Sequence, residues 1–362
     1  MENVSIFDFL PAEEAERFKP IKSTDWKWSF KDFPKYKYGL KVFSCFACGG
    51  GSTMGYKLAG CEVLGCCEID PKMNEVYVKN HNPKYNYLMD IREFNKIPDD
   101  EIPEELKNLD ILDGSPPCTT FSMAGDREDS WGKKKKFREG QAEQTLDDLS
   151  FVFIETVAKL KPKCVIMENV EGLIKGEAWG YVQKIYKQLN DLGYQVKHYL
   201  LKGENMGVPQ ARHRVFFIAL RGDMKFDIYD IDMAFNYMPI YFGEVKEGCG
   251  GGLSEKCAEL LDLATEKDLS LADILQRTEG RWSRFNEKIV WDENICCTIQ
   301  AHGMYRGNDK CKLSTEDYRN ASTFPSDYDF CDQSAAYICG MSVPPLMIKR
   351  LVTRLIESGV FK

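Results

Sequence analysis

A cysteine directly after two prolines is the residue of this chain best suited to covalent chemistry. The stretch DGSPPCTTFS, residues 113–122, places Cys118 next to Pro116 and Pro117. Because the proline ring fixes the backbone φ angle, the two prolines hold the segment before the cysteine stiffly. A thiolate in such a position is a rigid, directed nucleophile, and the alternative is an inert buried thiol.

An acidic residue ends another apolar stretch. KCVIMENV, residues 163–170, runs through valine, isoleucine and methionine into Glu168 and Asn169. A carboxyl group in this position is hard to explain as part of a core. Partial burial raises the pKa of a carboxyl group, so Glu168 is suited to donating a proton.

Two arginines alternate before a further apolar stretch. GVPQARHRVFF, residues 207–217, carries Gln210, Arg212 and Arg214. In an extended chain the two arginines face the same side. Together they can form a fork that binds an anion or an oxygen acceptor, and the alternative is a pair of solvated arginines at a sheet edge.

Three more candidates follow strand-like stretches. FACGGGS, residues 46–52, opens a helical stretch, and its glycines permit a tight turn and the close approach of a ligand, although a plain strand-to-helix turn is the alternative. Glu68 ends the next strand-like stretch, where an acid can bind ribose hydroxyls. Asp90 ends the third and is placed to meet an adenine amino group. Together these positions suggest a cofactor that contains adenosine.

These residues need a scaffold that brings several strand ends together. The predicted strands cover residues 41–47, 61–70, 85–91, 109–115, 163–170, 194–202 and 214–220. The predicted helices between them cover residues 52–60, 71–81, 149–162 and 180–193. Such alternation is typical of an α/β domain with a mostly parallel sheet, in which ligands bind at the carboxyl ends of the strands.

After Arg221 the alternation ends, which predicts a second, smaller domain. This part contains a glycine-rich run at 249–252, one helical stretch at 254–278 and a short strand candidate at 294–302. Near the end, residues 342–359 predict a helix with prolines at its start, where proline is tolerated. Its apolar positions suit packing back onto the first domain.

The composition describes an ordinary globular protein. The 362 residues are 43% hydrophobic and 29% charged, with a net charge of −8, which alone argues weakly against a nucleic-acid partner. No apolar run long enough to span a membrane and no secretory signal pattern is present. The 14 cysteines do not resemble a disulfide framework and favour a reducing compartment. Packing is the favoured interpretation of the Cys45–x–x–Cys48 pair, ahead of metal or redox chemistry, and no metal site is predicted.

In their order along the chain, FACGGG, GSPPCTTFS, MENV, QARHR and a late SVPP resemble the motifs of the cytosine-5 DNA methyltransferase family. The matches cover residues 41 to 358. The resemblance implies a Rossmann-like methyltransferase domain with S-adenosylmethionine as cofactor, plus a smaller target-recognition domain. It divides the chain into an N-terminal extension (1–40), a catalytic cofactor-binding domain (41–229), a target-recognition domain (230–325) and a C-terminal segment that returns to the catalytic domain (326–362).

The resemblance also implies a role for each catalytic candidate. Cys118 would add to carbon-6 of cytosine, which enables carbon-5 to attack a methyl group. Glu168 would hold the exocyclic amino group and ring N3, Arg214 would bind the base oxygen, and Arg212 would support the site. After the transfer the carbon-5 proton leaves and Cys118 is eliminated.

For the cofactor, the resemblance implies contacts from a loop, several strand ends and the C-terminal segment. The implied residues are Phe46, Ala47, Cys48, Gly49, Gly50, Gly51, Glu68, Ile69, Asp90, Ile91, Pro117, Leu149, Met341 and Val343. Two of them depart from the family pattern, since Cys48 stands where glycine is usual and Met341 where asparagine is usual. Met341 removes a polar partner and adds flexible bulk, so we expect weaker or altered cofactor binding.

The implied partner is duplex DNA, from which the target base is flipped out. Nucleic-acid contacts are predicted for Ser122, Lys133, Lys134, Lys135, Lys136, Gln210 and Thr298. The lysine run lies where the family has a loop that closes over DNA, and a solvated loop is the alternative. An RNA methyltransferase of the same fold and a nucleic-acid-binding protein without catalysis remain alternatives. We expect a cytoplasmic monomer, associated with the nucleoid if it is bacterial or phage-encoded, with a cognate restriction endonuclease as a candidate partner.

Overall fold

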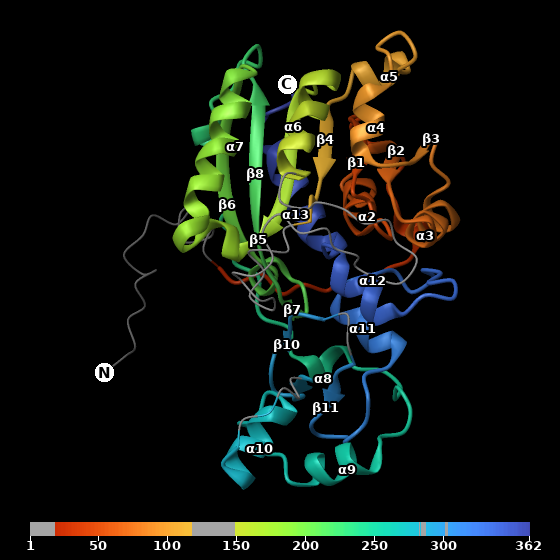
Figure 1. Ribbon diagram of the computed structural model, residues 1–362, viewed down its shortest axis with the longest axis vertical. Coiled ribbons are helices and arrows are strands. Elements are labelled where there is room, and N and C mark those ends of the chain that lie inside the picture. Colours follow the sequence, from red (N-terminus) through yellow and green to blue (C-terminus); the bar gives the residue numbers. More distant parts are fainter. Residues whose placement is uncertain (1–18, 118–148, 282, 284–286, 301–302) are drawn as a thin grey trace.

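The computed structural model describes residues 19–117, 149–281, 283, 287–300 and 303–362. Its centre is a seven-stranded sheet in the order β3-β2-β1-β4-β5-β8-β6 (Figure 1). The strands are β1 (Lys41–Cys45), β2 (Glu62–Glu68), β3 (Tyr85–Leu88), β4 (Ile111–Gly114), β5 (Cys164–Val170), β6 (Tyr194–Lys202) and β8 (His213–Arg221). All the strands that the sequence predicts for the first domain are therefore confirmed.

The sheet is parallel except at one strand. Strands β1 to β5 pair in parallel, and β8 runs antiparallel to both β5 and β6. The chain builds outward from β1 through β2 to β3 and then returns to place β4 on the other side of β1. Ligands of such sheets bind at this reversal, beyond the carboxyl ends of the strands. The predicted α/β class with a mostly parallel sheet is confirmed.

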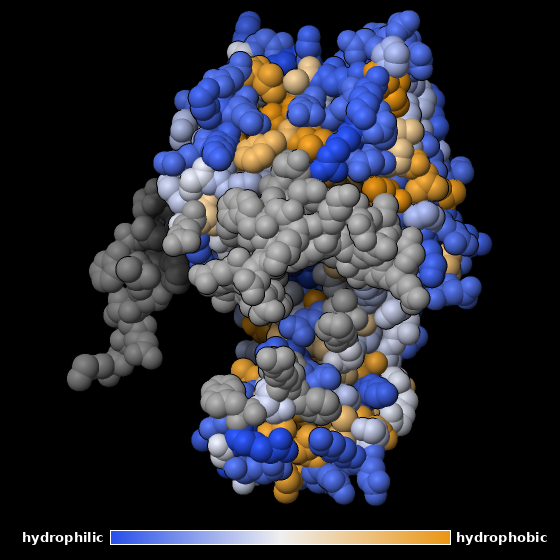
Figure 2. All heavy atoms as spheres, viewed as in Figure 1, coloured by the Kyte–Doolittle hydropathy of each residue, from blue (hydrophilic) through white to orange (hydrophobic). Residues whose placement is uncertain are grey.

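Helices cover both faces of the sheet (Figure 1). One face packs on α2 (Gly51–Leu58), α3 (Pro71–His81) and α13 (Pro345–Glu357); the other packs on α4 (Ile91–Lys96), α5 (Glu104–Lys107), α6 (Leu149–Leu160) and α7 (Trp179–Asp191). The two cores follow from strand alternation, since Val42 belongs to the first and Phe43 to the second. The outer surfaces of the helices in Figure 2 are mainly hydrophilic, with an apolar strip between them. The C-terminal helix α13 packs on the sheet, because Leu351 and Leu355 are fully buried in the first core.

Shorter elements lie beyond the carboxyl ends of the strands, in the lower part of Figure 1. They are β7 (Gln210–Ala211) paired with β10 (Cys296–Cys297), β9 (Ile289–Val290) paired with β11 (Tyr305–Arg306), α8 (Phe242–Val245), α9 (Glu255–Asp262), α10 (Leu271–Glu279), α11 (Thr315–Ala321) and α12 (Ala335–Met341). Helices α9 and α10 pack with β9 and β11 around a separate third core that includes Leu261, Ile274 and Trp291.

The prediction of one helical stretch at residues 254–278 is wrong, because the structure divides it into two helices. Helix α9 ends at Asp262, and α10 begins after Ser270, whose side chain accepts a hydrogen bond from the Asp273 N–H. Between the helices, the N–H and hydroxyl of Thr265 donate to the Asp268 carboxylate. Such local side-chain bonds compete with helical hydrogen bonding, although the apolar spacing continues across the break.

The described part of the N-terminal extension connects distant elements. Ile21 forms a β-bridge with Tyr237, and Trp28 donates from Nε1 to the Thr323 carbonyl oxygen at 2.8 Å. Asp25 pairs with Lys349 and Arg350 of α13, each at 2.6 Å. Although burial opposes ionisation, these two cations lower the pKa of Asp25 to about 2.

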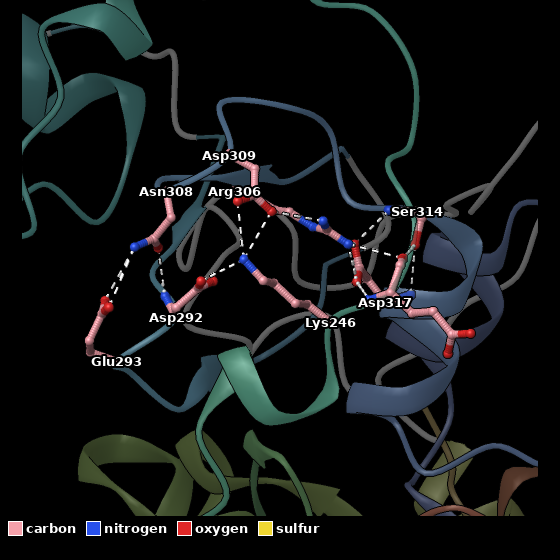
Figure 3. Close-up of polar contacts among 9 residues, drawn as sticks. Lys246, Asp292, Glu293, Arg306, Asn308, Asp309, Ser314 and Asp317 are labelled. Carbon is pink, nitrogen blue, oxygen red and sulfur yellow. Dashed lines mark hydrogen bonds and ion pairs between the residues drawn. The ribbon is translucent and has the colours of Figure 1, made fainter.

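A charged network joins the end of α8 to β11 and α11 (Figure 3). Arg306 is 3% exposed and donates from Nε and Nη2 to the fully buried Asp317 carboxylate at 2.9 and 2.6 Å. Its Nη1 donates to Asp309 at 3.0 Å. Lys246 donates to both Asp309 and Asp292. The network therefore fixes the third core against the helices nearer the sheet.

Candidate active site

The loop between β1 and α2 contains residues in left-handed backbone conformations. Phe46 and Cys48 have φ angles of +57° and +47°, and Gly50 at the N-cap of α2 has +88°. A Cβ at Gly50 would lie 2.0 Å from Nε2 of His81. Glycine at position 50 is therefore required by close packing as well as by the turn itself.

Glu68, at the end of β2, accepts a hydrogen bond from this loop. Its Oε2 accepts from the Cys48 N–H at 2.8 Å, and its Oε1 accepts from the Asp70 N–H at 2.8 Å. Burial raises the pKa of Glu68, while these two backbone donors oppose the rise. A carboxylate has more lone pairs than these two bonds use, so Glu68 retains acceptor capacity.

Two adjoining depressions form a cleft at the carboxyl ends of β1, β2 and β4, and they share Phe46 and Ile69. The first is lined by Phe46, Cys48, Glu68, Ile69, Asp70, Met73, Ser115, Pro117, Tyr337 and Met341. The second is lined by Phe46, Cys67, Ile69, Met89, Asp90, Ile91 and Leu149. The structure thus gathers most of the predicted cofactor residues. Ala47, Gly49, Gly50, Gly51 and Val343 are not among the lining residues, although the Val343 carbonyl would lie 2.5 Å from a Cβ at Gly51.

Sequence reasoning missed several lining residues, of which Tyr337 is the most informative. Tyr337 and Met341 are four residues apart on α12 and therefore share a helical face. This spacing from Met341 was a signal that could have found Tyr337. Met73 and Ser115 carried no comparable signal, since they reach the cleft only through the packing of α3 and the course of the chain after β4.

Asp90 lies at the second depression and also begins a helix. Its Oδ1 accepts from the Arg92 N–H at 2.8 Å, which caps α4. The Arg92 guanidinium lies 3.2 Å from Oδ2. A substrate group that bonds to Asp90 would therefore share its carboxylate with Arg92.

Glu168 and Arg214 meet near the carboxyl end of β5. The Arg214 Nε lies 2.8 Å from Glu168 Oε1, and the two side chains are 15% and 11% exposed. Arg214 is paired with Val170 across the β5–β8 ladder, so it shares a sheet face with Glu168, two residues away from Val170. Arg214 also donates from Nη1 to the His213 carbonyl at 2.7 Å.

Arg212 has a different environment from Arg214. It is 2% exposed, and its Nη2 donates to the Gly340 carbonyl at 3.1 Å. Its Nε and Nη1 have no hydrogen-bond partner among the described residues. Burial lowers the pKa of Arg212 to about 9, and the nearby Arg214 contributes to the lowering. The two arginines therefore do not share one partner here, and Arg212 links the site to the end of α12.

Asn169 connects β5 to the segment that leads to Cys118. Its Nδ2 donates to the Pro116 carbonyl at 3.3 Å, and its Oδ1 accepts from the Val170 N–H at 2.8 Å. The next residue, Pro117, lines the first depression of the cleft. Cys118 itself lies outside the described residues, as do Ser122, Lys133, Lys134, Lys135 and Lys136, so the predictions for them stay predictions.

The predicted nucleic-acid contact of Gln210 does not fit the structure. Gln210 is fully buried, its Nε2 donates to Ala321 and Ser322, and its Oε1 accepts from the Ile299 N–H. A side chain so enclosed supports the strand pair β7–β10 and is not available to a partner. Thr298 is half-buried, and its hydroxyl donates to the Ala211 carbonyl at 2.7 Å.

The Cys45–x–x–Cys48 pair lies in packed surroundings. Burial raises the pKa of both thiols, that of Cys48 to about 12, and Cys48 Sγ lies 3.6 Å from Met73 Sδ. No cluster of three or more His, Cys, Asp or Glu side chains suited to a metal occurs in the described part of the chain. Within the same part, no helix is long and apolar enough to cross a membrane.

The chain matches the family model described as C-5 cytosine-specific DNA methylase over residues 40–295. The chain belongs to this family. The matched range contains the glycine-rich loop, Glu68, the prolines before Cys118, Glu168 and both arginines. The resemblance drawn from the sequence motifs is therefore confirmed.

The curated relatives of this chain include type II methyltransferases. M.Sau96I of Staphylococcus aureus is 26% identical over 90% of this chain and 81% of its own. M.FnuDI of Fusobacterium nucleatum is 30% identical over 53% and 50%, and M.HindV of Haemophilus influenzae is 33% identical over 49% and 52%. The alignments with the last two thus span about half the length of those relatives.

Solved structures show the same fold. A prophage-encoded E. coli protein described as a DNA modification methyltransferase has a TM-score of 0.64 at 17% identity and covers 88% of this chain and 99% of its own. A mutant of Spodoptera frugiperda DNMT2 has a TM-score of 0.59 at 15% identity and covers 88% and 100%. At these identities the likeness concerns the fold of the chain alone.

Proposed function

We propose that this chain transfers a methyl group from S-adenosylmethionine to carbon-5 of cytosine in duplex DNA, with Cys118 as the nucleophile. The observation that carries the proposal is the position of the two prolines. The Pro116 carbonyl accepts a hydrogen bond from Asn169, the neighbour of Glu168, and Pro117 lines the cleft. Cys118 follows directly, so the proposal puts it within reach of a base held by Glu168, next to a methyl donor in the cleft.

The lining of the cleft fits an adenosine-containing methyl donor. The second depression offers the apolar side chains of Phe46, Ile69 and Leu149, with the Asp90 carboxylate beside them as an acceptor for an amino group. Glu68 has acceptor capacity for ribose hydroxyls. The first depression extends from Glu68 to Pro117, so the methionine part of S-adenosylmethionine would lie toward Cys118. S-adenosylmethionine supplies an electrophilic methyl group when it is bound.

The pair Glu168–Arg214 provides the groups that a cytosine ring needs. The Glu168 carboxyl group would hold ring N3 and the exocyclic amino group of the base. The Arg214 Nη2, which neither Glu168 nor His213 uses, can donate to the base oxygen. These bonds withdraw electrons from the ring and favour addition of the Cys118 thiolate at carbon-6. Carbon-5 then takes the methyl group, loses its proton, and the carbon–sulfur bond breaks.

The target base must leave the duplex to reach this site. We propose that residues 230–325 read the surrounding sequence, with the third core providing a rigid unit for base contacts. The lysine run at 133–136 would contact phosphates, and binding would then weaken steeply with salt. On this proposal the chain would act on one specific duplex sequence.

The test is methyl transfer to mixed-sequence duplex DNA by the full-length chain. After incubation with S-adenosylmethionine, the DNA is digested to nucleosides and analysed by mass spectrometry. The unaltered chain should yield 5-methyldeoxycytidine, and Cys118→Ala should yield none. Cys331→Ala changes a half-buried cysteine outside the cleft lining and is the matched control, which should retain the product.

Covalent chemistry is tested separately with duplex DNA that contains 5-fluorocytosine. Fluorine at carbon-5 cannot leave as a proton does, so the enzyme and DNA should remain linked at Cys118. Product formation without a trapped adduct would remove Cys118 as nucleophile. Methylation of RNA but not of DNA would replace the proposed substrate, and cofactor binding without any product would indicate a binding protein.

A further inference from the structure

Cys249 differs from the other described cysteines in two respects. It is the only exposed one in the part of the chain that the structure describes. A hydrogen bond from the Cys311 thiol and another from the Gly251 N–H lower the pKa of Cys249. By contrast, burial raises the pKa of cysteines such as Cys61 and Cys339, each to about 12. Solvent access together with a stabilised thiolate is the environment of a reactive cysteine.

Cys311 is held beside Cys249 by backbone contacts. It lies in a tight hairpin, in which the Arg306 N–H donates to the Cys311 carbonyl at 2.8 Å, and it is 8% exposed. The Gly250 N–H donates to the Lys312 carbonyl at 2.9 Å, which joins the two segments one residue beyond each cysteine.

The glycine-rich run at 249–252 is what permits this approach. A Cβ at Gly250 would lie 2.0 Å from the Leu313 carbonyl oxygen, and Gly251 has a φ angle of +100°. Another residue at position 250 would force the loop away from the hairpin. A Cβ at Gly252, in contrast, would have no atom within 4 Å, so only part of the run is fixed by packing.

Two members of the charged network of Figure 3, Arg306 and Asp309, act electrostatically on both cysteines. Burial and the hydrogen bond to Cys249 raise the pKa of Cys311 to about 11. The Arg306 guanidinium favours the thiolate form of both Cys249 and Cys311, and the Asp309 carboxylate opposes it. Arg306 is itself fixed by Asp317. A fixed cation thus lies within electrostatic reach of both sulfur atoms, one exposed and one shielded.

We propose that Cys249 and Cys311 form a dithiol site that reacts with a low-molecular-weight disulfide such as glutathione disulfide. The Cys249 thiolate attacks one sulfur of the disulfide and displaces one glutathione thiolate. The Cys311 thiolate then attacks the Cys249 sulfur and displaces the second glutathione. The two protein thiols lose two protons and two electrons, and one glutathione disulfide becomes two glutathione molecules. Cys249 is the attacking residue because it is exposed, and Cys311 is the resolving residue because it is shielded.

The bond would link residues on either side of α9, α10 and β9. The segment it closes, residues 250–310, contains the third core and most of the proposed recognition domain. Oxidation would therefore fix this unit against the hairpin that carries Arg306. The dithiol chemistry itself does not depend on methyl transfer, so the two proposals stand or fall separately.

The reduced chain is incubated with glutathione disulfide, free thiols are blocked with N-ethylmaleimide, and the digest is analysed by mass spectrometry. We expect an early Cys249–glutathione adduct that decays as a peptide pair linking Cys249 to Cys311 appears. Cys249→Ser should prevent the link and leave Cys311 blocked only by maleimide. Cys331→Ser, the control, should form the link as the unaltered chain does.

Two variants distinguish the reactivity of Cys249 from the placement of Cys311 beside it. Cys311→Ser should stop the reaction at the Cys249 adduct. Gly250→Ala should slow the link at least ~tenfold, because its Cβ cannot fit beside Leu313, while maleimide labelling of Cys249 keeps its rate. A stable Cys249 adduct without the link in the unaltered chain would overturn the proposal, as would no reaction at Cys249. Either result is independent of Cys118, whose reactivity is mapped in the same digest.

Discussion

Replacing Arg306 with methionine should destabilise the chain more than any exposed charge change in the same network. Arg306 is 3% exposed and Asp317 is fully buried, so the variant leaves a buried carboxylate without its cation. Breaking a buried pair from one side costs ~3–5 kcal/mol. Asp317 also accepts from the Ser314 and Glu247 N–H groups, and these bonds offset part of the loss. We therefore expect Arg306→Met to lower the free energy of unfolding by about 3 kcal/mol.

The assay is urea unfolding followed by circular dichroism, with two further variants measured beside it. Lys246→Met removes a cation that is 25% exposed from the same network and should cost at most ~1 kcal/mol. Adding Asp317→Asn to Arg306→Met removes the buried carboxylate charge that has lost its cation, and should recover part of the lost free energy of unfolding. If Arg306→Met costs no more than Lys246→Met, or if the double variant is less stable than the single one, the reasoning from burial is wrong.

Three further predictions concern the sheet and the cleft. Glu68→Gln should weaken S-adenosylmethionine binding at least ~tenfold by calorimetry, because a charge-assisted acceptor is lost, and an unchanged affinity would remove Glu68 from the cofactor site. Asn169→Ala should lower kcat for DNA methylation at least ~tenfold with cofactor affinity unchanged, because it removes the hydrogen bond that joins Pro116 to β5. A change confined to cofactor binding would contradict this prediction. Burial raises the pKa of Asp113 to about 7, although Ser44 and Tyr56 donate to its carboxylate. Between about pH 4 and 7 the folded chain keeps a proton on Asp113 that the unfolded chain has lost, so this group lowers the free energy of unfolding as pH rises. Asp113→Asn removes this pH dependence, and its free energy of unfolding should rise by up to ~4 kcal/mol relative to the unaltered chain across that window. Parallel curves of stability against pH for the two chains would refute the prediction.

The sheet and its strand ends were predictable because they rest on local patterns. In KCVIMENV the change from apolar to polar residues indicates where the strand approaches its end, and the structure places Glu168 and Asn169 near the end of β5. The parallel arrangement follows from alternation of strands with helices, and it brings these ends to one edge. Thus Phe46, Glu68 and Asp90 reach one cleft although they are far apart in the sequence.

What the sequence did not reveal depends on contacts between distant segments. Gln210 reads as a polar residue beside two arginines, yet β10 and α11 enclose it, and no local pattern shows that enclosure. The break between α9 and α10 depends on a side-chain bond between Thr265 and Asp268, which the apolar spacing conceals. Likewise Tyr337 reaches the cleft only because α12 folds back over the glycine-rich loop.

The two halves of the proposed reaction are divided between the two sides of β4. The cleft lies over the ends of β1 and β2 on one side, and Glu168 lies near the end of β5 on the other. The segment after β4 contacts both, through Pro117 and through the bond from Asn169 to Pro116. Proline at both positions limits how far the next residue can move relative to either side. In the proposed reaction, this stiffness would hold the nucleophile beside the base while the base faces the methyl donor in the cleft.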